Sequence, residues 1–250
     1  MRISTVSASK LSLSDNSSIT DCIWREDNVL PVKRRDARLD VARHAADLFI
    51  RNGLAATSGA HIAAASGLSE RTIWRYFGSK ESCVEPLFLA TTLRFHAKLR
   101  RWPRHVSIED HLDECCKLED ASPQDIADGV LAVQLLALMA KEPALRGVWL
   151  VAAYAMEQDL VSIIADRLDR SVRDFDVRLC AATIAAAMRM IDETISIAAI
   201  EHKQQFTTQE IVQHLAKAIR QASTLPICDP ITPNVFGRAD RPLPAQGPTP

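Results

Sequence analysis

Apolar residues recur every three to four positions through most of the chain, which is the spacing of amphipathic α-helices rather than the alternation of β-strands. Capping signals mark several starts: Thr207 and Glu210 fit a capping box, and Ser122 precedes Pro123. The pattern predicts an all-α protein. Helices are expected over 36–52, on either side of Gly67, over 80–102 with a kink or a late start at Pro86, from Ser107 as a shorter helix, and over 122–141, 143–168, 174–202 and 207–222.

The two ends of the chain lack this periodicity. Residues 1–32 are rich in serine, aspartate and asparagine, and seven of the twelve prolines lie within residues 226–250. Both segments are predicted to be disordered tails, because neither offers enough apolar surface to offset the entropy of ordering. Between the tails we predict a small three-helix domain over 33–82 and a larger helical bundle over 83–225.

Charge is also unevenly distributed along the chain. Residues 33–104 carry 14 Lys and Arg against 6 Asp and Glu, whereas residues 105–250 carry 13 against 21. A basic module indicates a polyanionic partner. The chain has no uninterrupted run of 18 apolar residues and no signal-peptide pattern at its start, so we expect a cytoplasmic protein without a membrane partner.

The six cysteines form no CxxC pair, and the acidic, histidine and serine positions form no recognisable catalytic arrangement. We therefore expect no disulfide framework, no metal site, no cofactor and no enzymatic activity.

Residues 59–77 read GAHIAAASGLSERTIWRYF, and their spacing predicts a helix-turn-helix. Ala63 is small where two helices must cross, Gly67 can adopt the positive φ of the turn, and Ser69 can cap the second helix. Ile73 and Phe77 are the apolar positions of that second helix. Its remaining side chains are polar or aromatic, which is typical of a helix that reads the DNA major groove.

Side-chain chemistry assigns roles within this motif. Arg71 can donate two hydrogen bonds to guanine, Thr72 can contact a thymine methyl group, and Glu70 can accept a hydrogen bond from cytosine. Ser58 begins the first helix of the motif and can bind a phosphate together with free helix N–H groups. Double-stranded DNA is therefore the expected partner.

The stretch TIWRYFGSKE, residues 72–81, resembles the signature of TetR/AcrR-family transcriptional regulators, and the resemblance is specific over residues 37–85. It implies that Trp74, Tyr76 and Lys80 contact the DNA backbone. The predicted DNA-binding residues are Ser58, Ser69, Glu70, Arg71, Thr72, Trp74, Arg75, Tyr76 and Lys80.

Three positions depart from the family's usual residues. Trp74 stands where tyrosine is usual, Gly59 where a branched apolar residue is usual, and His61 where a charged residue is common. Gly59 is expected to destabilise its helix by up to ~1 kcal/mol relative to alanine.

The resemblance further implies a homodimer in which the helices over 174–202 and 207–222 pair across a twofold axis. The first of these is apolar nearly all round, as a dimer face requires. Twofold symmetry would separate two recognition helices by roughly 34 to 36 Å and select a palindromic operator.

The larger bundle is expected to bind a small, mostly apolar effector. The predicted ligand-binding residues are Met139, Trp149, Tyr154, Met188 and Asp192, with Met156 as a further candidate; core packing is the alternative for the soft and aromatic ones, and an ion pair or a dimer contact for Asp192.

These features predict a ligand-responsive repressor that leaves its operator when the effector binds. Two alternatives stay open. One is a redox- or metal-responsive helical regulator that uses His111, Cys115 and Cys116. The other is a helical protein-interaction module, whose binding would lack the salt dependence of phosphate contacts.

Overall fold

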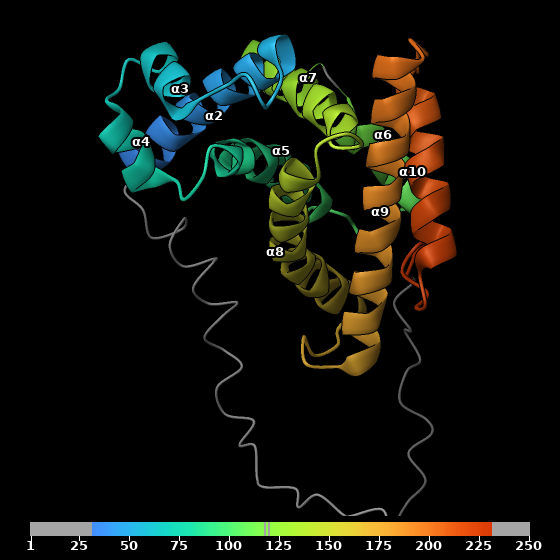
Figure 1. Cartoon of the computed structure of the whole chain (residues 1–250). Helices are drawn as coiled ribbons and strands as arrows, with labels where there is room; N and C mark the ends of the chain where they lie inside the picture. The colour runs from blue at the N-terminus through green and yellow to red at the C-terminus, as the bar shows by residue number, and fades with distance from the viewer. Residues whose placement is uncertain (1–31, 118, 120, 232–250) are drawn as a thin grey trace, which may run out of the picture.

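The computed structural model describes residues 32–117, 119 and 121–231, and every regular element in these ranges is helical (Figure 1). The predicted all-α class is confirmed. The predicted tails lie outside the described residues over 1–31 and 232–250. The elements are α2 (Val32–Asn52), α3 (Gly59–Ala65), α4 (Glu70–Tyr76), the 3-10 helix η1 (Glu81–Val84), α5 (Glu85–Leu99), α6 (Ile108–Cys115), α7 (Pro123–Leu138), α8 (Pro143–Leu168), α9 (Phe175–Glu201) and α10 (Thr208–Ala222).

Helix starts follow the predicted capping signals. Ser107, Ser122 and Thr207 each accept a hydrogen bond from the backbone N–H three residues later. At Ser122 and Thr207 the acidic residue at that third position reaches back to the cap, completing the capping box. Local sequence therefore determines where α6, α7 and α10 begin.

The α-helix predicted over 80–102 starts late, which is one of the two outcomes expected from Pro86. Residues Glu81–Val84 form the 3-10 helix η1, and α5 begins only at Glu85, with Pro86 in its first turn. Proline has no N–H to donate and is tolerated only at the start of a helix, so a single regular helix cannot run through this position. At the other end of the N-terminal unit, α2 begins at Val32, inside the predicted tail.

The prediction of disorder from residue 226 onward is wrong for residues 226–231, which pack against the body of the protein. Ile227 and Cys228 are 2% and 4% exposed. The Cys228 carbonyl accepts a hydrogen bond from the Ile108 N–H at 2.8 Å, and the Ile231 N–H donates to the Arg104 carbonyl at 2.7 Å. Apolar burial and these hydrogen bonds order the segment despite its prolines.

Arg167 of α8 binds residues 226–231 to the rest of the protein. Its guanidinium donates to the carbonyls of Ile227 at 2.7 Å, Val106 at 3.0 Å and Asp229 at 3.2 Å. The same group lies 3.6 Å from the centroid of the Trp102 ring. Burial lowers the pKa of Arg167 to about 10, so the side chain remains cationic at neutral pH.

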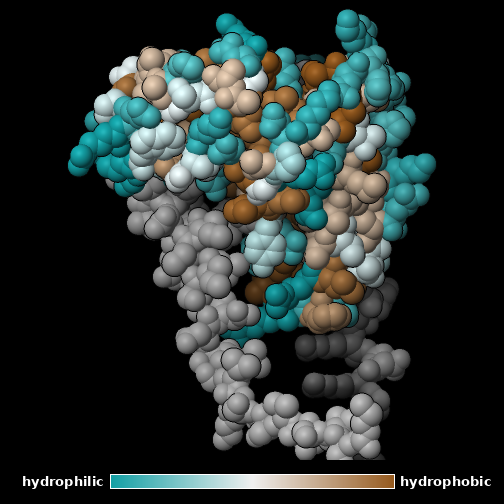
Figure 2. Space-filling view, viewed as in Figure 1, coloured by the Kyte–Doolittle hydropathy of each residue, from teal (hydrophilic) through white to brown (hydrophobic). Residues whose placement is uncertain are grey.

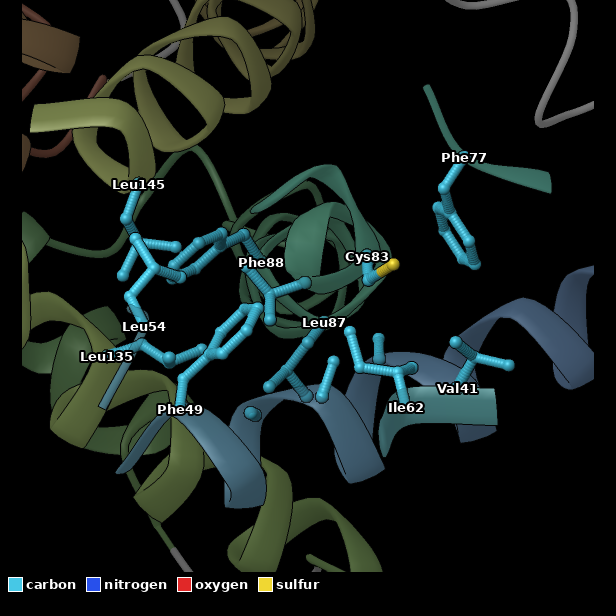
Figure 3. Close-up of a cluster of buried hydrophobic side chains, with 14 of the residues drawn as sticks. Val41, Phe49, Leu54, Ile62, Phe77, Cys83, Leu87, Phe88, Leu135 and Leu145 are labelled. Atoms are coloured by element: carbon cyan, nitrogen blue, oxygen red, sulfur yellow. The ribbon is translucent and has the colours of Figure 1, made fainter. Parts of the chain in front are cut away.

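Two hydrophobic cores stabilise the molecule. The first contains the apolar faces of α2 to α5 together with Leu135 of α7 and Leu145 and Trp149 of α8 (Figure 3). The second lies among α6, α8, α9, α10 and Ile227. The first core is continuous across residue 82, so the predicted domain boundary at that position is not a break in packing. The division into two domains there remains a proposal.

In Figure 1 the α3–α4 hairpin and the α9–α10 pair lie at opposite sides of the molecule. The corresponding edges of the surface are mostly hydrophilic, while hydrophobic side chains gather between them (Figure 2). Within the described residues, α8 is long and apolar enough to span a membrane by length and composition alone. It packs here between α5 and α9 as a core helix.

Candidate nucleic-acid interface and effector cavity

The helix-turn-helix is formed by α3, the turn at Gly67, and α4. Gly67 has φ +65°, the left-handed conformation that glycine adopts readily, and the Leu68 N–H donates to the Ala63 carbonyl at 3.0 Å. On α4, Ile73 is fully buried and Phe77 follows it into the core at 4% exposure. These anchors turn the opposite face of α4 toward solvent.

The exposed face of α4 carries Glu70, Arg71, Trp74 and Arg75. Ser69 caps the helix by accepting from the Thr72 N–H, and the two hydroxyl groups lie 2.9 Å apart. Ser69 and Thr72 therefore hydrogen-bond to each other at the start of α4, whereas the guanidinium of Arg71 projects from its first turn.

Trp74 and Gly59 form an interlocking pair. A Cβ atom added to Gly59 would overlap Cζ2 of the Trp74 ring and lie 2.7 Å from Cη2. The indole Nε1 donates to the Glu70 carboxylate at 3.2 Å. The two departures from the family's usual residues, Trp74 and Gly59, are therefore coupled, because the larger indole occupies the space that a side chain at position 59 would need.

His61, the third departure, completes the N-cap of α3. The His61 N–H donates to the Ser58 hydroxyl at 3.2 Å, and the His61 Nδ1 accepts from the Ser58 N–H at 3.2 Å. This is a capping box in which an imidazole replaces the usual carboxylate or amide. The arrangement requires an unprotonated Nδ1, so the ring carries its proton on Nε2 when neutral.

Two arginines lie against the ring of Tyr76. The guanidinium carbons of Arg34 and Arg75 are 5.4 and 5.3 Å from its ring centroid, and the ring meets Phe77 edge-on. Arg34 comes from the first turns of α2, so the N-terminus of α2 contributes positive charge beside the recognition helix. Arg34 was not among the predicted DNA-binding residues.

Lys80 is engaged within the protein. Its Nζ donates to the carbonyls of Leu54 at 2.6 Å and Thr57 at 3.0 Å, both in the connection between α2 and α3. An ammonium group has three donors, so one remains for a DNA phosphate. The phosphate contact of Lys80 stays a prediction. Lys80 also has a structural role, because it bonds to the connection between α2 and α3.

Three of the predicted ligand-binding residues line one cavity. Trp149 of α8 and Met188 and Asp192 of α9 surround a cavity of about 50 Å³ whose remaining wall includes Phe88 and His96 of α5. Met139 lies elsewhere, buried at 1% exposure in the first core, and the Tyr154 side chain is 52% exposed on α8. The Met156 side chain is outside the described structure.

His96 is a residue of this cavity that the sequence prediction missed. The side chain is 2% exposed, and its Nδ1 lies 3.6 Å from Oδ2 of Asp159. Interactions with His96 and with the Arg100 guanidinium, 2.7 Å from Oδ1, hold the pKa of Asp159 below its usual range. The spacing of Phe88, Thr92 and His96 along α5 was the available signal, since residues four apart share a helix face.

The Cys115 thiol approaches His111, as the redox alternative requires. Sγ lies 3.4 Å from Nε2, but burial raises the pKa of Cys115 to about 11 and also raises that of Cys116. A protonated thiol is a poor nucleophile and a poor metal ligand. Among the described residues, no three histidine, cysteine or acidic side chains are grouped as a metal would need. Burial of the thiols weighs against redox or metal chemistry here, and the alternative based on His111, Cys115 and Cys116 stays a prediction.

Residues 42–87 match the family model described as "Bacterial regulatory proteins, tetR family". The resemblance predicted over residues 37–85 is thereby confirmed: this segment is similar to the helix-turn-helix of TetR-family regulators. The match covers the helix-turn-helix segment and not the rest of the chain. None of the curated proteins matches the chain.

Several solved structures are similar to the chain at low sequence identity. GusR of Salmonella enterica is 21% identical, with a TM-score of 0.47 over 74% of this chain and 96% of that protein. A TetR-family regulator of Streptomyces coelicolor is 18% identical, with a TM-score of 0.48 over 76% and 80%. FadR of Thermus thermophilus, a TetR-family repressor in complex with lauroyl-CoA, is 18% identical, with a TM-score of 0.47 over 84% and 100%.

Proposed function

We propose that this chain is a ligand-responsive transcriptional regulator that binds a palindromic operator as a homodimer and leaves it when an effector fills the cavity. The observation that carries the proposal is the exposed face of α4. Buried Ile73 and Phe77 anchor the helix, while Arg71, Trp74 and Arg75 face solvent within the segment that matches the TetR family. A short anchored helix with exposed arginines suits the major groove.

The proposed contacts fall into two kinds. Arg71 reads a base, because its guanidinium can donate two parallel hydrogen bonds to guanine. Tyr76 and its flanking Arg34 and Arg75 bind the phosphate backbone, which fixes the position of the protein but carries no sequence information. Ser58, Ser69, Glu70, Thr72, Trp74 and Lys80 complete the proposed interface.

The dimer is proposed to form chiefly through α9. Phe175, Leu179 and Met190 are 74%, 41% and 71% exposed, and at ~100° per residue they lie within about 60° of one another around the helix. By contrast, α10 buries its apolar residues against α9 and α6 and turns glutamine, lysine and arginine outward. The apolar part of the interface therefore comes from α9, with α10 supplying a polar rim.

The size of the cavity gives the release mechanism a physical basis. Pockets for small organic ligands usually measure about 300 to 1,000 Å³, whereas this cavity holds about 50 Å³. An effector must therefore move α5, α8 or α9 apart. A ligand that binds only the expanded conformation shifts the population toward it and lowers operator affinity by the same preference ratio.

Fluorescence anisotropy tests the proposal, with DNA from upstream of the gene, unrelated DNA as control, and two salt concentrations. We expect a preference of about a thousandfold or more for one site and a steep salt dependence. Arg71→Ala should cost ~1 to 3 kcal/mol at one base pair and relax selectivity there, while Tyr76→Ala weakens binding to all sequences. Lys117→Ala, at an exposed position just after α6 and outside both proposed interfaces, is the control. Salt-insensitive binding or equal affinity for all DNA would contradict the proposal.

A further inference from the structure

Asp128 of α7 is a completely buried carboxylate, with 0% exposure, at the point where three helices meet. Its Oδ1 accepts hydrogen bonds from Arg43 Nε at 2.8 Å and Gln124 Nε2 at 3.0 Å. Its Oδ2 accepts from Arg43 Nη2 at 3.1 Å and Arg94 Nη2 at 3.3 Å. One side chain of α7 is thus bonded to α2 through Arg43 and to α5 through Arg94.

The bonding shows that Asp128 is charged. Burial alone would raise its pKa, but the hydrogen bonds from Arg43 and Gln124 and the positive charges of Arg43 and Arg94 outweigh burial and hold the pKa below its usual range. The pKa of Arg43 is raised in turn by the hydrogen bond to Asp128. The two arginine nitrogens meet the two carboxylate oxygens side by side, the arrangement in which an ion pair is also most directional.

The two arginines belong to functionally different helices. Arg43 lies on α2, within the segment that matches the TetR family and on the helix whose first turns hold Arg34 against Tyr76. Arg94 lies on α5, between Thr92 and His96 of the cavity wall. Residues two apart point to nearly opposite sides of a helix, so α5 presents one face to the cavity and the other to Asp128.

We infer that Asp128 is a positioning residue that fixes the orientation of the DNA-binding helices relative to the cavity wall. The Arg43–Asp128 pair joins α2 to α7, and the Arg94–Asp128 pair makes that junction sensitive to the position of α5. Displacement of α5 by an effector lengthens the distance between Arg94 and Asp128 and weakens their ion pair, because charge interactions become weaker with distance and with the entry of water. The link to an effector rests on the proposed function; the positioning role does not.

The test measures orientation directly in the full-length protein, without DNA or effector. Spin labels are attached to cysteines introduced at Arg71 of α4 and Arg178 of α9, in a background in which Cys22 and Cys116 are serine. The four remaining native cysteines are buried. Labelled protein is mixed with an excess of unlabelled protein, so that a dimer carries at most one labelled chain. Pulsed electron paramagnetic resonance then gives the distribution of distances between the two labels of that chain. We expect a narrow distribution for the parent protein and a broadened or shifted one for Asp128→Asn, which keeps the shape of the side chain and removes its charge.

Asp159→Asn is the matched control. Asp159 of α8 forms ion pairs with His96 of α5 and with Arg100 at the end of α5, and neither pair includes α2. This variant should lose thermal stability but keep the parent distribution. Arg94→Met removes one partner and leaves the Arg43 pair in place, so it gives an intermediate broadening, and it serves as the test variant if Asp128→Asn does not fold.

An unchanged distribution in Asp128→Asn overturns the inference, as does equal broadening in Asp159→Asn, which would indicate general loosening. In the DNA-binding assay, Asp128→Asn should weaken operator affinity roughly tenfold without altering base preference, because fewer molecules hold the competent orientation. If no DNA is bound by the parent protein, the proposed function fails while the distance measurement still decides the role of Asp128.

Discussion

The α3–α4 hairpin and the helices around the cavity are stabilised by contacts of very different range along the chain. In the hairpin, Ser58 pairs with His61, Ser69 with Thr72 and Glu70 with Trp74, all three or four residues apart. Around the second core, Arg167 bonds to carbonyls about sixty residues away. Asp128 reaches 85 residues back to Arg43.

This difference shows how the α3–α4 hairpin can keep its internal structure while the helices around the cavity change position. Local contacts are complete within a few turns of helix and are insensitive to distant changes. Long-range contacts depend on the relative position of whole helices, so a displacement in the body alters them first. Signals from the cavity should therefore change the orientation of the hairpin rather than its internal structure.

The largest expected effect comes from removing the long-range contacts of Arg167. Arg167→Met leaves buried carbonyls of Ile227 and Val106 without their donor and removes the stacking on Trp102. Each buried acceptor left without a donor costs about 1–3 kcal/mol, so we expect the loss of several of them together to lower the unfolding free energy by about 3–5 kcal/mol. Chemical denaturation measures the loss, and limited proteolysis should cut first near residues 226–231.

Arg173→Met, at an exposed position in the α8–α9 connection, is the control and should change stability by less than ~0.5 kcal/mol. If Arg167→Met unfolds with wild-type stability, the carbonyls have found other partners and the segment at 226–231 does not depend on Arg167. Affinity for DNA, measured well below the melting temperature, should stay close to wild type because the hairpin does not contain these contacts.

Lys80 follows the α3–α4 hairpin in the chain, but its hydrogen bonds reach residues more than twenty positions earlier. Lys80→Met removes charged hydrogen bonds to the Leu54 and Thr57 carbonyls, and we expect a loss of about 1.5–3 kcal/mol in unfolding free energy. It should also lower the slope of log affinity against log salt by about one, if the third N–H reaches a phosphate.

Lys141→Met, which breaks a surface ion pair with Glu201 far from α4, should leave the salt slope unchanged. A loss of stability in Lys80→Met with no change in slope would confine Lys80 to its structural role and remove it from the DNA interface.

The range of contacts also explains what sequence could predict. Capping at Ser122 and Thr207, the turn at Gly67 and the burial of Ile73 follow from residues close together in the chain, and each was predicted and is present. The Ile227 carbonyl is bonded to Arg167, sixty residues away, and proline content, which carries no sign of such a partner, gave the wrong answer for residues 226–231.

The cavity was predictable only in part for the same reason. Trp149, Met188 and Asp192 line it, but Met139 and Tyr154 were chosen by the same chemical criterion and face elsewhere. Residue type identifies soft and aromatic side chains; only the packing of α5 against α8 and α9 decides which of them meet. Asp128 was not singled out, because one aspartate in an apolar helix carries no sign of its distant partners.

The smallest expected effect comes from Gly59→Ala, which changes a contact within the α3–α4 hairpin. Gly59→Ala should raise the helix propensity of α3 by up to ~1 kcal/mol, but its methyl group displaces the Trp74 ring and breaks the bond to Glu70. We expect little net change in unfolding free energy, a shift in tryptophan emission, and a fall in DNA affinity of roughly fivefold to tenfold, the scale of one lost hydrogen bond.

The coupling of the two positions is tested by a double-mutant cycle with Trp74→Tyr. Tyrosine lacks the ring atoms that meet position 59, so Gly59→Ala should have almost no effect on DNA affinity in the Trp74→Tyr background. Ala60→Gly, at the exposed neighbour on α3, is the control for backbone flexibility and should leave the tryptophan emission unchanged. Equal losses from Gly59→Ala in both backgrounds would mean that the two residues act independently, and that the hairpin tolerates the larger indole for a reason other than the missing side chain at position 59.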